Sequence, residues 1–123
     1  MEVQINFYPS SGGQLVYSVD LSEDSLQVRD LGSRNNISGA CYKRVLTAKE
    51  IKRIDQAITQ VRQREVTETE IILDSWRVEV LINGQKYYNE SGVRLKTLPQ
   101  DISDLLKLLL KRSKVKIDLY DFS

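Results

Sequence analysis

Histidine is absent from the 123-residue sequence, and this absence removes several kinds of chemistry. Histidine is the commonest general base and metal ligand, and its charge changes near neutral pH. Without it, neither a Ser-His-Asp nor a Cys-His catalytic arrangement can be assembled from this chain. Zinc sites of the Cys/His type are excluded as well, because Cys41 is the only cysteine. The same count rules out an internal disulfide, and we expect Cys41 to be a small buried side chain.

Motifs that hold a cofactor or a metal ion are also missing. Gly12–Gly13 lacks both the spacing of a phosphate-binding loop and the helix that should follow it. Asp20, Ser22 and Asp24 have the first spacings of a calcium loop, but Ser25 stands where that loop needs glycine. We therefore predict no cofactor and no metal site.

A charge excess and long apolar runs are missing too. The 18 basic and 17 acidic residues give a net charge of +1, so nucleic acid is not the favoured partner. No apolar stretch approaches the roughly 18 residues of a membrane span. The opening stretch, MEVQINFYPSSGG, has no basic region followed by an apolar one, which predicts no signal peptide. We expect a cytoplasmic protein; the alternative is an exported protein whose signal segment is absent from this chain.

The strongest positive signal is a hairpin within residues 71–89. Asn83–Gly84 suits a type I′ turn because both residue types tolerate positive φ, and strand-forming residues flank the pair. A regular two-residue turn places Val80 opposite Tyr87. We expect this hairpin to lie at the centre of the sheet.

The predicted register assigns each hairpin side chain to one sheet face, because neighbouring residues of a strand point to opposite faces. The apolar face is predicted to be buried and carries Trp76, Val78, Val80, Ile82 and Tyr87. The other face is predicted to be exposed and carries Arg77, Glu79, Leu81, Lys86, Tyr88 and Glu90. Arg77 and Glu90 are predicted to lie opposite each other as a complementary pair.

Alternating apolar residues predict further strands at 2–8, 14–19, 26–30 and 114–120, with short segments at 41–46 and 93–95. The sequence from Thr47 to Glu50 matches a capping box and begins a helix whose apolar stripe is Ile51, Ile54, Ile58 and Val61. A second helix is predicted to begin at Pro99, with the stripe Ile102, Leu105, Leu106 and Leu109.

These elements predict a single α+β domain over residues 1–123. We expect an antiparallel sheet of five to seven strands, in the chain order β-β-β-α-β-β-α-β, with two helices packed on one face.

Two regions are candidates for contact with a partner. Outward tyrosines beside charged residues on a sheet are typical of binding surfaces. The Gly-, Ser- and Asn-rich segment 31–40 is the second region, since irregular segments often carry function. The predicted partner-binding residues are Arg77, Glu79, Tyr88, Tyr120, Arg34, Asn35 and Asn36.

The sequence therefore favours a non-catalytic protein-binding module, for example a small inhibitor or immunity-type protein that masks a partner protein. One alternative is nucleic-acid or phosphate binding through the basic residues around the first helix, which are Lys43, Arg44, Lys49, Lys52, Arg53, Arg62 and Arg64. A second alternative is an enzyme that uses carboxylates alone. Its candidates are Asp74, Glu79, Glu90, Asp101 and Asp104.

Overall fold

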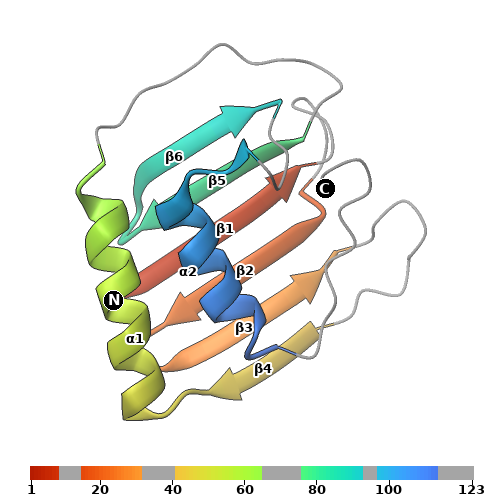
Figure 1. The fold of residues 1–123 in the computed structure, drawn as a ribbon. Coiled ribbons are helices and arrows are strands. Elements are labelled where there is room, and N and C mark those ends of the chain that lie inside the picture. The colour runs from red at the N-terminus through yellow and green to blue at the C-terminus, as the bar shows by residue number, and fades with distance from the viewer. Residues whose placement is uncertain (9–14, 32–40, 65–75, 93–96, 114–123) are drawn as a thin grey trace.

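The structure, a computed structural model, describes residues 1–8, 15–31, 41–64, 76–92 and 97–113. These residues form one antiparallel six-stranded sheet and two helices, which confirms the predicted α+β class (Figure 1). In chain order the elements are β1 (Glu2–Tyr8), β2 (Tyr17–Ser22), β3 (Ser25–Asp30), β4 (Cys41–Val45), α1 (Ala48–Arg62), β5 (Arg77–Ile82), β6 (Gln85–Ser91) and α2 (Gln100–Leu110).

The order of elements along the chain differs slightly from the prediction. The short segment before the first helix is a full strand, β4, so four strands precede α1. β2 extends to Ser22, three residues beyond the end of the strand predicted at 14–19. The predicted strands at 93–95 and 114–120 lie outside the described residues.

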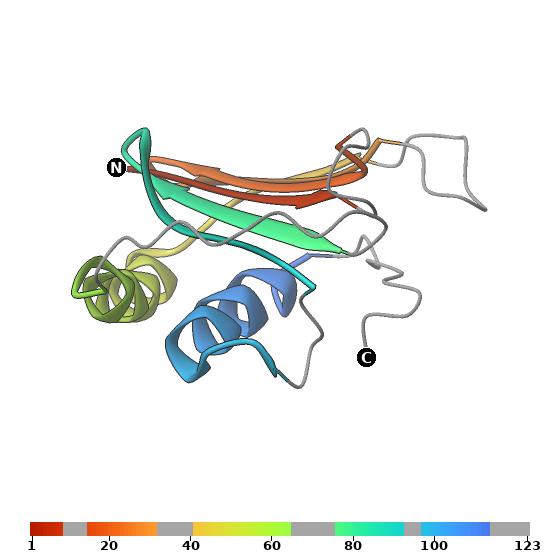
Figure 2. The same cartoon turned by 90° about the horizontal axis from the view of Figure 1, so that it is seen from above.

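The domain has two layers, with both helices on the same side of the sheet (Figure 2). Apolar residues that alternate along the strands point into the space between sheet and helices. Ile54, Ile58 and Val61 of α1 are buried there, and so is the whole predicted stripe of α2. Trp76, just before β5, is also buried, as predicted.

Local sequence signals set the starts of both helices. The Thr47 hydroxyl accepts a hydrogen bond from the Glu50 N–H at 3.2 Å, and the Glu50 carboxylate accepts one from the Thr47 N–H at 3.0 Å. This reciprocal pair is the predicted capping box, and it satisfies two backbone donors that a helix leaves free. α2 begins at Gln100, one residue later than predicted. Pro99 is the N-cap residue and not the first residue of the helix.

The β5–β6 hairpin has the predicted turn but a different register. Asn83 and Gly84 have φ of 51° and 79°, as a type I′ turn requires. An irregularity between Val80 and Leu81 then shifts the pairing, so that Val80 lies opposite Tyr88 instead of Tyr87. A β-bulge adds one residue to one strand and reverses the faces of the residues beyond it.

The structure corrects several predictions about the hairpin, and the first follow from this shift. Tyr88, predicted to be exposed, is 7% exposed and belongs to the core, whereas Tyr87 is only partly buried. Arg77 lies opposite Ser91, so the predicted cross-strand pairing with Glu90 is wrong. The hairpin is also not central, because β6 is an edge strand and β1 and β2 are the middle strands.

Cys41 is the remaining correction, because its side chain is exposed. It begins β4, the other edge strand, and lies opposite Arg29 of β3. This register places it on the sheet face that the helices do not cover. Its sulfur lies 3.3 Å from the Gln27 amide nitrogen.

Candidate functional site

The sheet face opposite the helices carries mostly polar side chains, and no described helix lies over it (Figure 2). We call it the polar sheet face. The strand pairings place on it Glu2, Gln4, Asn6 and Tyr8 of β1; Ser18, Asp20 and Ser22 of β2; Ser25, Gln27 and Arg29 of β3; Cys41, Lys43 and Val45 of β4; Arg77, Glu79 and Leu81 of β5; and Lys86, Asn89 and Ser91 of β6.

Arg77 is the centre of one network on this face. Its guanidinium carbon lies 3.9 Å from the centre of the Tyr8 ring, in the geometry of a cation–π contact. Its Nη1 donates to the Asn89 side-chain oxygen at 3.1 Å and lies 3.7 Å from the Glu79 carboxylate. Only 17% of the Arg77 side chain is exposed. The guanidinium is therefore fixed in place before any partner arrives.

Glu79 completes this network. It accepts a hydrogen bond from the Asn6 side-chain amide at 3.0 Å, and its second oxygen lies 3.3 Å from the Lys86 ammonium. Arg77 also lies beside the Glu79 carboxylate, so three side chains, those of Asn6, Lys86 and Arg77, contact it. We call the set Asn6, Tyr8, Arg77, Glu79, Lys86 and Asn89 the Arg77 cluster.

A second network lies on β2 and β3. Arg29 donates to the Ser18 hydroxyl at 3.1 Å and to the Asp20 carboxylate at 3.2 Å. Ser18 is fully buried and donates to Asp20 at 2.6 Å. A shallow hollow of about 250 Å³ lies beside this network and is lined also by Gln4 and Gln27. The polar sheet face thus carries one ordered arginine on β3 and another on β5, each one strand in from an edge.

The structure tests where the predicted partner-binding residues lie. Arg77 and Glu79 are together on the polar sheet face, in contact with each other. Tyr88 is on the opposite, buried face, so its assignment to the outward surface is wrong. Tyr120 and the set Arg34, Asn35 and Asn36 lie outside the described residues.

Sequence reasoning missed Tyr8, Asn6 and Asn89 as members of the site. The alternation along β1 already groups Asn6 and Tyr8 on its polar side. What the sequence did not provide was the pairing of β1 with β5, which brings Tyr8 opposite Arg77.

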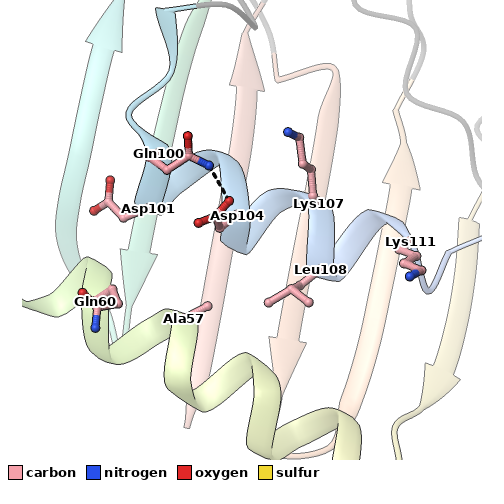
Figure 3. Close-up of a pocket in the computed structure, with 8 residues that line it drawn as sticks. All are labelled: Ala57, Gln60, Gln100, Asp101, Asp104, Lys107, Leu108 and Lys111. Carbon is pink, nitrogen blue, oxygen red and sulfur yellow. Dashed lines mark hydrogen bonds between the residues drawn. The ribbon is translucent and has the colours of Figure 1, made fainter.

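A groove between α1 and α2, of about 740 Å³, is a second surface feature (Figure 3). We call it the helix groove. It is lined by Ala57, Gln60, Gln100, Asp101, Asp104, Lys107, Leu108 and Lys111. Arg64 donates two hydrogen bonds to the Asp101 carboxylate, at 2.7 and 2.9 Å. The Gln100 amide donates to Asp104 at 2.7 Å. Asp101 and Asp104, two of the five candidates for carboxylate chemistry, thus have separate partners.

The basic residues around α1 are divided by the fold. Lys43 lies on the polar sheet face, on the other side of the sheet from α1. Arg44 pairs with Glu50 at 3.1 Å, and Arg64 pairs with Asp101. Lys49, Lys52, Arg53 and Arg62 are exposed on the helix itself.

Glu50 connects three elements. Its carboxylate lies 3.1 Å from Arg44 of β4 and 2.8 Å from Arg112, just after α2, in addition to capping α1. The hydrogen bond from the Thr47 backbone, aided by the two arginines, lowers the pKa of Glu50 below its usual 4.5. This site holds β4, α1 and α2 together.

The pKa of Tyr88 is shifted in the opposite direction to that of Glu50. Burial, with a smaller contribution from the charge of Glu90, raises the pKa of Tyr88 to about 12. Arg64 lies over its ring, with the guanidinium carbon 5.5 Å from the ring centre.

Comparison of the chain with protein-family models, curated proteins and solved structures gave no match. Within the described ranges, no helix is long and apolar enough to cross a membrane. Those ranges also contain no group of three or more acidic, cysteine or histidine side chains arranged to hold a metal ion.

Proposed function

We propose that this chain is a protein-binding module that holds a partner protein on the polar sheet face. The observation that carries the proposal is the Arg77 cluster, in which Arg77 is packed on Tyr8 and bonded to Asn89. Arginine and tyrosine are among the residue types that contribute most to protein interfaces. Because their side chains are already ordered, a partner that binds them loses less conformational entropy.

The chemistry of the face favours a protein over a polyanion. Lys86 and Arg77 both pair with the Glu79 carboxylate, and Arg29 pairs with the Asp20 carboxylate. Positive and negative side chains are therefore mixed on this face. A surface of mixed sign fits a partner with a complementary mixed pattern, and it sets orientation and specificity. A nucleic acid would instead need a run of cations.

The dimensions of the face suit a small partner interface. Strands about 4.8 Å apart with a rise of about 3.3 Å per residue make six short strands roughly 25 Å wide and 20 Å long. The flat area of such a face is roughly 500 Å², which is below the roughly 800 Å² per partner of a standard interface and suits a small contact. A small inhibitor or immunity-type protein that masks its target would use a face of this size.

Affinity capture with matched variants tests the proposal. The wild-type protein, Arg77→Glu and the control Lys52→Glu, which alters an exposed residue of α1, are each immobilised and exposed to an extract of the source organism. We expect one protein that is retained by the wild type and by the control through high salt, and lost with Arg77→Glu. Equal capture by the wild type and both variants would exclude the polar sheet face. Release of nucleic acid as salt rises would favour the basic surface of α1 instead.

A further inference from the structure

The solvent side of α2 carries a single polar stripe. Gln100, Asp104, Lys107 and Lys111 are exposed, and they recur at intervals of four, three and four residues. Residues at these intervals lie along one side of a helix. This side is opposite to the buried leucines of α2, and its four residues are among those that line the helix groove. Lys107 extends from α2 in the direction away from α1 (Figure 3).

The charges of this stripe are not compensated within the described part of the chain. Asp101 is neutralised by Arg64, but among the described residues Asp104 has only the neutral Gln100 amide as its partner. Lys107 and Lys111 make no ion pair with any described residue. The stripe therefore presents one available anion in its first half and two available cations in its second half.

The groove beside this stripe has an apolar floor. Leu108 points from α2 toward α1, where Ala57 faces it (Figure 3). Leu108 is only half-buried, and the short side chain of Ala57 leaves space between the helices. The favourable position of acids early and bases late in a helix explains the order of charges. It does not explain an apolar groove next to them.

We propose that the helix groove is the contact surface between two copies of this chain. Across a two-fold axis near the middle of α2, the helix of the second copy runs antiparallel to the first. Asp104 then lies opposite Lys107 of the second copy, and the same pair recurs with the roles exchanged. Leu108 of each copy fills the space over Ala57 of the other. The pattern is self-complementary, as an interface between identical copies requires.

The size of the contact predicts a weak dimer. An eleven-residue helix such as α2 is about 16 Å long, and the fifteen residues of α1 span about 22 Å. Two short helices per copy place the interface at the small end of specific contacts. The dimer leaves both polar sheet faces pointing outward, so it would present two partner sites and gain avidity for a multivalent partner.

Charge exchange between two variants tests the proposal. Asp104→Lys and Lys107→Asp each place like charges across the axis, so each variant alone should dimerise at least tenfold more weakly than the wild type. An equimolar mixture restores both opposite-charge pairs, and so does the double variant Asp104→Lys/Lys107→Asp. Sedimentation equilibrium from micromolar to near-millimolar protein measures each constant, and far-UV circular dichroism with thermal melting checks that every variant is folded.

Lys43→Asp, on the polar sheet face, is the control and should dimerise like the wild type. Two results would overturn the proposal. One is a wild-type protein that stays monomeric over the whole concentration range. The other is a mixture of the two charge variants that associates no better than either variant alone.

Discussion

Arg64, just after the end of α1, holds the Asp101 carboxylate at the start of α2 through hydrogen bonds of 2.7 and 2.9 Å. The two residues are 37 positions apart in the sequence, so this contact ties the helices to each other independently of the sheet. Both hydrogen bonds come from Nη1 of Arg64, so one guanidinium nitrogen serves both carboxylate oxygens. They are charge-assisted, and charge-assisted hydrogen bonds are stronger than neutral ones.

A double-mutant cycle on this pair measures its contribution. We expect Arg64→Ala and Asp101→Ala each to destabilise the fold, with a coupling of about 1 kcal/mol, because both side chains remain partly exposed. Urea unfolding of the wild type, the two single variants and the double variant gives the coupling energy. A coupling free energy indistinguishable from zero would mean that the Arg64–Asp101 pair does not stabilise the fold.

The bulge in the β5–β6 hairpin predicts unequal costs for two neighbouring tyrosines. Tyr88→Ala should cost about 3 kcal/mol of unfolding free energy, since it removes a large buried ring. Tyr87→Ala should cost about 1 kcal/mol or less, because Tyr87 is only partly buried. Chemical denaturation of both variants makes the comparison. A larger cost for Tyr87→Ala than for Tyr88→Ala would indicate that the hairpin has the regular register without a bulge.

Most helices and strands, and the two site residues Arg77 and Glu79, could be predicted from the sequence because their signals are local. The capping box at Thr47 and the Asn83–Gly84 turn depend on residues a few positions apart, and both predictions were confirmed. Alternation along β5 likewise placed Arg77 and Glu79 together on the outward face.

What the sequence did not predict depends on long-range pairing. The Tyr8–Arg77 contact requires β1 to lie beside β5, strands that are about 70 residues apart. The burial of Tyr88 depends on a bulge, which no local signal in the hairpin announced. Cys41 is exposed because β4 is an edge strand, and edge position is a property of the whole sheet.

The lowered pKa of Glu50 predicts a stability that depends on acid pH. A carboxyl whose folded-state pKa is depressed stabilises the fold above its usual value of 4.5. This stabilisation disappears as pH falls through the lower folded-state pKa. Wild type should therefore melt at a higher temperature than Glu50→Gln at neutral pH, and the gap should close below about pH 4.

Thermal melts across this pH range measure the gap, with Glu2→Gln as the control because Glu2 is exposed and forms no ion pair with a described residue. The control should follow the wild type at every pH. A constant gap between wild type and Glu50→Gln would show that the arginines Arg44 and Arg112 do not act through the ionised carboxylate.

The raised pKa of Tyr88 predicts that stability also depends on pH in the alkaline range. The pKa of Glu50 is lowered, whereas that of Tyr88 is raised. Its folded-state pKa of about 12 lies above the usual 10.0, so between these values the unfolded chain releases the phenolic proton while the folded chain retains it. The fold should therefore lose stability as pH rises from about 10 toward 12. Tyr88→Phe has no such proton and should lose less stability over this interval.

Ultraviolet absorbance of the ionised phenol follows the same group directly. We expect Tyr88 to titrate near pH 12 in the folded protein, so the absorbance change in that range should be smaller in Tyr88→Phe, by the amount of one tyrosine, than in the wild type. Denaturant unfolding at pH 9 and pH 11 then compares the two proteins at equal salt. If Tyr88→Phe and the wild type lose stability in parallel, Tyr88 is accessible to water, and the packing of β6 against Arg64 and α2 is looser than its 7% exposure implies.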